Sequence, residues 1–96
     1  MTKGVTYATF RKKYAKIDHW PEHVIVVSCL WEDAAHSEDH EDASTMFSFI
    51  SGTVVEATPK HLKLAMEVFP DKSARDVTTI PSTLIRKIIP WGSLKL

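Results

Sequence analysis

The chain has little cysteine, little glycine and no net charge. The single Cys29 excludes an intrachain disulfide framework and is typical of a reducing cytosol. The three glycines, Gly4, Gly52 and Gly92, lie too far apart to form a glycine-rich phosphate loop. No apolar run reaches the roughly 18 residues of a membrane span, and the polar N-terminus does not resemble a secretory signal. We therefore expect a cytoplasmic protein with no membrane partner.

Motifs for catalysis are also missing. There is no Gly-x-Ser-x-Gly sequence to hold an activated serine, and nothing in the sequence indicates a cleft between paired carboxylates. No cofactor-binding pattern is present either. We expect a protein that is not an enzyme and that needs no cofactor.

What the chain does contain is enough apolar material for one folded domain. Its 96 residues are 44% hydrophobic, which fits a globular protein with a core. A second domain of the remaining length would be too small to stabilise itself. We expect a single domain over residues 1–96, with a helix and linker in 1–20 and the rest in 21–96.

The most unusual segment is "WEDAAHSEDHED", residues 31–42, with six carboxylates, two histidines and no lysine or arginine. On a helix, His36 and His40 would share a face with Asp33. However, Ser37 follows the first histidine, so this is not the HExxH zinc motif, and an EF-hand loop is missing its central glycine. A solvated loop, an adventitious cation site and a functional metal site stay open. We expect a solvated loop over residues 32–43 and no metal site.

Residues 6–17 have the pattern of a short amphipathic helix. Tyr7, Phe10, Tyr14 and Ile17 recur at spacings of three, four and three, which forms one apolar stripe, and Thr6 is a suitable N-cap. Pro21 disfavours helix at the residue before it, so the helix is expected to end upstream.

From residue 23 onward the pattern is that of strands. The predicted strands are 23–31, 44–58, 61–69, 77–80 and 86–91, because each is β-branched or alternates with period two. Gly52 inside the second strand indicates a bulge or sharp bend. Turn sequences lie at 58–61 and 70–76, and residues 81–85 can form one tight helical turn. The expected fold is mainly β, with five strands and an N-terminal α-helix.

The span "SGTVVEATPKHLKLAMEVFPDKSARDVTTIPSTLIRKI" resembles the small Sm-like β-barrel. The shared features are a bent strand with a glycine, an alternating strand, and a strand that runs into "TIPxxxIxxI". The resemblance implies a small five-stranded barrel preceded by a helix, and an RNA-binding role. The long acidic loop after the first strand departs from the compact Sm pattern.

The chain is also similar to small phage-encoded proteins of unannotated function. Trp31, Asp33 and Ala34 match the end of a strand that leads into a small barrel, and Ile80–Pro81 matches a later strand end. This resemblance implies a viral accessory protein that acts in the host cell cytoplasm. It implies no mechanism.

The basic residues suggest a ligand site. Arg11 lies among lysines on the predicted helix beside Phe10 and Tyr14, and cations beside aromatic rings suit phosphates and bases. Arg75 and Arg86 lie in or beside later turns, where Sm-like barrels place ligand-contacting groups, and an arginine fork fits phosphate. The predicted ligand-binding residues are Phe10, Arg11, Tyr14, Arg75 and Arg86. The alternative is that the charges are ordinary solvated surface and the two rings belong to the core.

Two functions follow from these patterns. The first is a homo-oligomer that binds a nucleotide or RNA, in one version a viral anti-defense protein that sequesters a host signalling nucleotide. The second is a protein-interaction module that docks a host protein through the acidic loop and the apolar C-terminal residues Ile88, Ile89 and Trp91. Convergence of Arg75 and Arg86 on one pocket would favour the first function, and their dispersal would favour the second.

Overall fold

The computed structural model describes residues 4–15, 21–33 and 46–95. Within them the chain forms one α-helix, five strands and one turn of 3-10 helix between the last two strands. In chain order these are α1 (Tyr7–Tyr14), β1 (His23–Asp33), β2 (Met46–Ala57), β3 (His61–Val68), β4 (Ala74–Pro81), η2 (Ser82–Leu84) and β5 (Ile85–Lys95).

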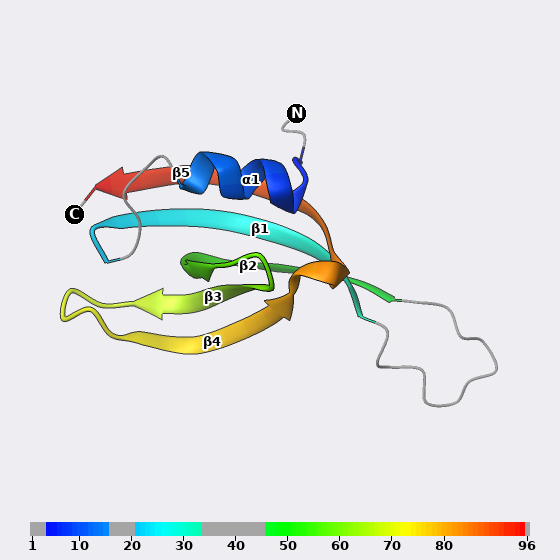
Figure 1. Cartoon of the computed structure of the whole chain (residues 1–96). Coiled ribbons are helices and arrows are strands. Elements are labelled where there is room, and N and C mark those ends of the chain that lie inside the picture. The colour runs from blue at the N-terminus through cyan, green and yellow to red at the C-terminus, as the bar shows by residue number, and fades with distance from the viewer. Residues whose placement is uncertain (1–3, 16–20, 34–45, 96) are drawn as a thin grey trace.

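The five strands make one antiparallel sheet in the order β4-β3-β2-β1-β5 (Figure 1). The prediction of a mainly β fold with five strands and an N-terminal helix is therefore confirmed. No ladder joins β4 to β5 in the described ranges, so the sheet is open at these two strands. Within the same ranges, no helix has the length and apolarity needed to cross a membrane.

Helix α1 begins at the predicted cap. The Thr6 hydroxyl accepts a hydrogen bond from the backbone N–H of Thr9 at 3.2 Å, which satisfies one of the free donors of the first turn. The predicted apolar stripe is confirmed through Tyr14, because Tyr7, Phe10 and Tyr14 are all buried. The last predicted member of the stripe lies outside the described residues.

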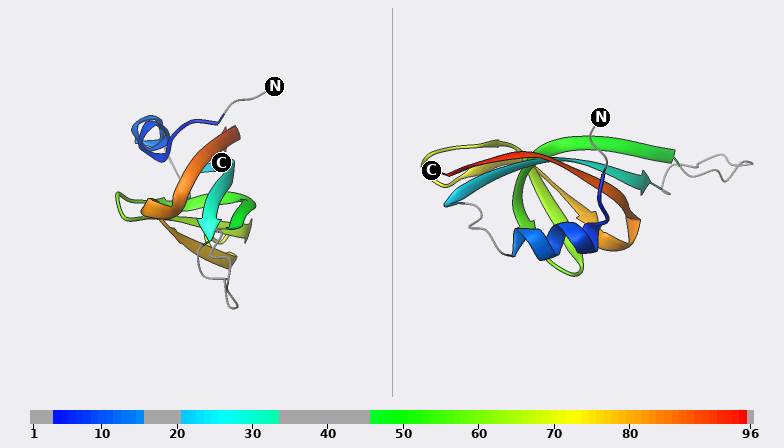
Figure 2. Two further views of the ribbon diagram at one scale, coloured as in Figure 1. Left: turned by 90° about the vertical axis from the view of Figure 1, so that its right-hand side faces the viewer. Right: turned by 90° about the horizontal axis from the view of Figure 1, so that it is seen from above.

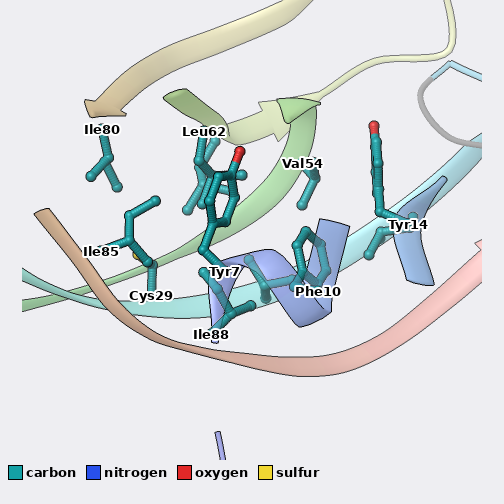
Figure 3. Packing of buried hydrophobic residues seen from close by; sticks show 12 residues of the cluster. Tyr7, Phe10, Tyr14, Cys29, Val54, Leu62, Ile80, Ile85 and Ile88 are labelled. Carbon is teal, nitrogen blue, oxygen red and sulfur yellow. The ribbon is translucent and has the colours of Figure 1, made fainter. Parts of the chain in front are cut away.

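The core lies between α1 and one face of the sheet. Side chains alternate across a strand, so Ile25, Val27 and Cys29 of β1 all point toward the helix and are buried. Figure 3 shows Tyr7 and Phe10 directed from α1 toward the strand residues of this cluster. The cluster is completed by residues of the other strands, among them Val54, Leu62, Leu64, Ile80, Ile85 and Ile88.

Gly52 lies where β2 passes very close to β3. A Cβ at this position would be 2.7 Å from the carbonyl oxygen of Ala65, so any side chain would force the backbones apart. Shortly after it, the ladder between β2 and β3 changes register between Val54 and Glu56. The strands curve strongly, and α1 lies on the inside of that curve (Figure 2). Gly52 was predicted to mark a bulge or sharp bend; the structure shows a close backbone approach at this position, and the register shift follows at Val54 to Glu56.

Three strand boundaries were predicted wrongly. β1 continues to Asp33, two residues into the predicted acidic loop, because it pairs with β2 as far as Met46. β4 begins at Ala74, inside the predicted turn, because a tight hairpin with Lys72 at φ 74° and a Phe69 N–H bond to the Ser73 carbonyl brings Ala74 directly onto β3. β5 continues to Lys95 and not only to residue 91, because its polar end pairs with His23 of β1. In all three cases a neighbouring strand extends a segment whose own composition favours loop. The helical turn predicted before β5 is confirmed as η2.

Candidate functional site

The predicted ligand residues of α1 are mostly inside the protein. The side chains of Phe10 and Tyr14 pack in the core with their ring centroids 5.7 Å apart. Arg11 is half-buried, and its Nε has no hydrogen-bond partner in the described ranges. The two rings match the alternative interpretation, in which they are core residues, and stacking on a base would require α1 to move.

Arg75 lies near the start of β4, beside the β3–β4 hairpin. Its guanidinium forms an ion pair with Glu67, with Nε 3.1 Å from Oε1, and it lies 5.6 Å from the centroid of the Phe69 ring. The cation is therefore already paired with an anion and an aromatic ring of the protein itself.

Arg86 lies just after η2, at the other end of β4. Its Nε is 2.8 Å from Glu32 Oε2, and its Nη1 donates to the carbonyl of Thr83 at 2.9 Å. Arg75 and Arg86 are separated by most of β4, about 20 Å at roughly 3.3 Å per residue. The structure does not bring them together, and each has its own acidic partner. Their ligand-binding role stays a prediction.

The acidic loop is largely outside the described residues, since only positions 32 and 33 of its predicted range belong to β1. In the described ranges, no group of three or more His, Cys, Asp or Glu residues could hold a metal ion. Glu32, at the start of the predicted range of this loop, forms an ion pair with Arg86. The solvated-loop interpretation stays a prediction.

Burial favours the neutral, protonated forms of the Cys29 thiol and of the two tyrosine hydroxyls in the core. Desolvation raises the pKa of the Cys29 thiol to about 12, and the side chain is fully buried. A thiol that is buried and protonated in this way is a poor nucleophile. Desolvation also raises the pKa of both Tyr7 and Tyr14 to about 12, and the Tyr7 hydroxyl lies 2.8 Å from the carbonyl oxygens of Thr58 and His61.

A small polar cluster lies on β2 and β3. Glu56 Oε1 is 3.4 Å from Lys63 Nζ, and its Oε2 is 3.5 Å from His61 Nε2. The hydrogen bond from Lys63 is the main reason that the pKa of Glu56 is below its usual value. The cluster is accessible to solvent, so it resembles an ordinary surface ion pair.

The other face of the sheet, which points away from α1, was not predicted from the sequence. Residues of β1 on this face pair across the ladder with residues of β2, so Leu30 is opposite Phe49 and Glu32 is opposite Phe47. Phe47 and Phe49 are 59% and 66% exposed. Two large rings next to each other on a sheet surface are unusual in a soluble domain.

β5 extends this face on the other side of β1. The ladder places Ile89 opposite Ser28, and Trp91 occupies the register shift that follows. The Trp91 indole Nε1 donates to Ser28 Oγ at 2.7 Å, so the ring lies over β1 on this face while remaining 59% exposed. We call this surface the outer face; its apolar residues are Val26, Leu30, Phe47, Phe49, Ile89 and Trp91.

The centre of the outer face is hollowed. The hollow has a volume of about 330 Å³ and is lined by Gly4, Leu30, Phe49, Lys87 and Ile89. Lys87 is opposite Leu30 in the ladder and forms no ion pair with a described residue. Ser28 and Ser51 lie in the next ladder row with their hydroxyl oxygens 2.6 Å apart, so they satisfy each other and the Trp91 N–H.

One signal in the sequence could have indicated this face. The run Val24 to Val27 is apolar without alternation, which is typical of a strand that is covered on both sides. Only one side of β1 is covered by α1, and on the other side Val26 and Leu30 remain partly exposed.

Comparison with known proteins adds no relative: no family model, no curated protein and no solved structure matches the chain.

Proposed function

We propose that this protein is a non-enzymatic protein-interaction module that uses the outer face as its contact surface. The observation that carries the proposal is the group of three aromatic side chains, Phe47, Phe49 and Trp91, each more than half exposed on one side of the sheet. Aromatic residues are enriched in the buried centres of protein interfaces, where they bury large areas at a small cost in side-chain entropy.

The proposal refines the second function that the sequence suggested. Of the apolar C-terminal residues, Ile88 is fully buried in the core, whereas Ile89 and Trp91 belong to the outer face. The contact surface is therefore built from β5 together with β1 and β2. A host protein is one candidate partner.

Binding of a phosphate-bearing ligand has less support. Arg75 and Arg86 are ion-paired at opposite ends of β4, and the rings of Phe10 and Tyr14 are in the core. Calorimetric titration with mononucleotides, cyclic dinucleotides and short RNA tests this function directly. Because a charge-assisted contact contributes about 1.5–3 kcal/mol, a true site would bind about tenfold to a hundredfold more weakly after Arg11→Ala, Arg75→Ala or Arg86→Ala.

We also propose that the curved sheet is a small Sm-like barrel left open between β4 and β5, and that the protein is of viral origin. A helix before the sheet, the close approach at Gly52 and the tight turn η2 between β4 and β5 support the first part. The second part rests on the sequence resemblance alone. A viral and a non-viral origin are both compatible with an interaction module.

Site-specific photo-cross-linking tests the proposed function. A photoreactive phenylalanine analogue replaces Phe49 in one variant and Met66 in another; Met66 is 73% exposed on β3 and belongs by alternation to the opposite side of the sheet. We expect a specific cross-linked protein band from position 49 in cells and none from position 66. Equal or absent cross-linking at the two positions contradicts the proposal.

A further inference from the structure

We infer that the partner covering the outer face is a second copy of this chain, packed face to face in a two-fold symmetric dimer. The inference rests on the proposed function, because it names the protein that binds the same surface. Three properties of the outer face support it: its area, its shape and its charge.

The area is that of an interface centre. An aromatic residue carries roughly 150–250 Å² of surface, so the three rings exposed by about 60% present on the order of 300–400 Å² in each copy. Val26, Leu30 and Ile89 enlarge the patch further. The largest apolar patch of a typical monomer is itself about 300–600 Å² and often functional, and a standard interface buries about 800 Å² per partner. The outer face supplies the apolar half of that area, and its polar border can supply the remainder.

The shape is self-complementary. A two-fold interface requires one surface to provide both a projecting group and the cavity that receives it. The outer face has both, since the Phe49 ring is 66% exposed and stands on the wall of the hollow lined by Leu30, Ile89 and Lys87. The hollow of about 330 Å³ has room for the phenyl ring of a second copy. In the proposed dimer each Phe49 inserts against Leu30 and Ile89 of the other copy.

The charge favours a like partner. Glu32 and Arg86, which border the face at one end, neutralise each other within the same chain. The chain has a formal net charge of zero, so two copies do not repel each other at long range. Lys87 is the one lining cation, and its long stem allows the ammonium group to remain in solvent at the border.

Sedimentation velocity of the full chain between about 1 and 200 µM tests the inference. We expect the wild type to form a species of twice the chain mass of 10.9 kDa. Phe49→Ser should weaken dimerisation at least a hundredfold, because it removes the inserted ring, whereas Met66→Ser should leave it unchanged. Circular dichroism of both variants verifies that they are folded. Should Phe49→Ser fail to fold, Ile89→Ser provides a second test from the receiving side.

A sample of mixed labelled and unlabelled chains tests how the two copies contact each other in the dimer. In a one-to-one mixture of isotope-labelled and unlabelled chains, magnetisation transfer is expected from the Phe49 ring of one copy to the Leu30 and Ile89 methyl groups of the other. A dimer that is insensitive to Phe49→Ser and lacks these contacts overturns the inference, because its interface lies elsewhere. A wild type that stays monomeric at 200 µM but cross-links from position 49 to a different protein overturns the inference and leaves the proposed function standing. A monomer with no such cross-link overturns both.

Discussion

The two faces of β1 have similar composition but opposite environments. Val27 and Cys29 are fully buried beneath α1, whereas Val26, their neighbour on the other face, is 38% exposed. Neighbouring ladder positions on this second face are occupied by Leu30, Phe49 and Ile89, which are as apolar as the core residues. Hydrophobic character alone therefore does not decide burial; what decides it is whether another element covers the face.

Each face also has a polar group that orients a large aromatic ring. On the inner face the Tyr7 hydroxyl bonds to backbone carbonyls at the turn between β2 and β3. On the outer face Ser28 accepts the indole N–H of Trp91. The inner ring ends up buried and the outer ring remains largely in solvent, so a similar anchoring device serves a packed core in one place and an accessible surface in the other.

The sharpest test of this comparison removes one large side chain from each face. Leu62→Ala, on the inner face, should lower the free energy of unfolding by about 2–5 kcal/mol, because it loses burial and leaves a cavity. Phe49→Ala, on the outer face, should cost no more than about 1 kcal/mol for the monomer. Urea denaturation at a protein concentration below the dimer range measures both. Similar losses for the two variants would show that the outer face is covered within the monomer.

A second test follows the ionisation of tyrosine at alkaline pH, which reports on the inner face because both tyrosines of the chain lie there. Tyr7 and Tyr14 have pKa values of about 12 in the folded protein against 10 when unfolded. The unfolded chain therefore releases protons first, and stability that is complete below pH 10 is lost as the pH rises from 10 to 12. We expect a loss on the order of 1–3 kcal/mol for each tyrosine.

Tyrosinate absorbance near 295 nm, recorded with urea midpoints at pH 8 and pH 11, monitors this transition. Ionisation of both tyrosines near pH 10 in the still-folded protein would contradict their burial under α1.

A third test compares a glycine whose surroundings are crowded with a glycine that has open space around it. Gly52→Ala should destabilise by about 1–3 kcal/mol, since its Cβ would meet the Ala65 carbonyl oxygen at 2.7 Å. Gly92→Ala, on the outer side of β5, is the matched control, because nothing lies within 4 Å of its Cβ. Thermal unfolding of the pair should show a clear fall in Tm for the first and almost none for the second. Equal Tm values would mean that β2 and β3 do not approach so closely.

The smallest expected effect is that of the surface ion pairs. Arg75→Ala should change the free energy of unfolding by less than about 1 kcal/mol, because both Arg75 and Glu67 are largely exposed. Chemical denaturation at low and high salt measures it. A loss of several kcal/mol would assign Arg75 a structural role that its exposure does not explain.

Much of the fold was predictable because local patterns agreed with it. The spacing of Tyr7, Phe10 and Tyr14 predicted the buried stripe of α1, and Thr6 predicted its start. The alternation of residues 61–69 predicted β3. The ends of β4 and β5 were not predictable, because Ala74 and Lys95 join strands only through pairing with β3 and β1. The ligand residues were chosen by residue type and turn position, and neither property reveals that Arg75 and Arg86 already have acidic partners.

By itself, the sequence determined the fold class: mainly β with a short amphipathic helix, since periodicity and capping are local properties of the chain. The tertiary structure alone decided which apolar side chains are covered. β1 is apolar on both sides, and α1 can pack against only one of them. The second face was left open by the placement of the helix and assembled from β1, β2 and β5, segments far apart in sequence that meet only through strand pairing. Such a surface depends on register and cover, and these are set by long-range contacts.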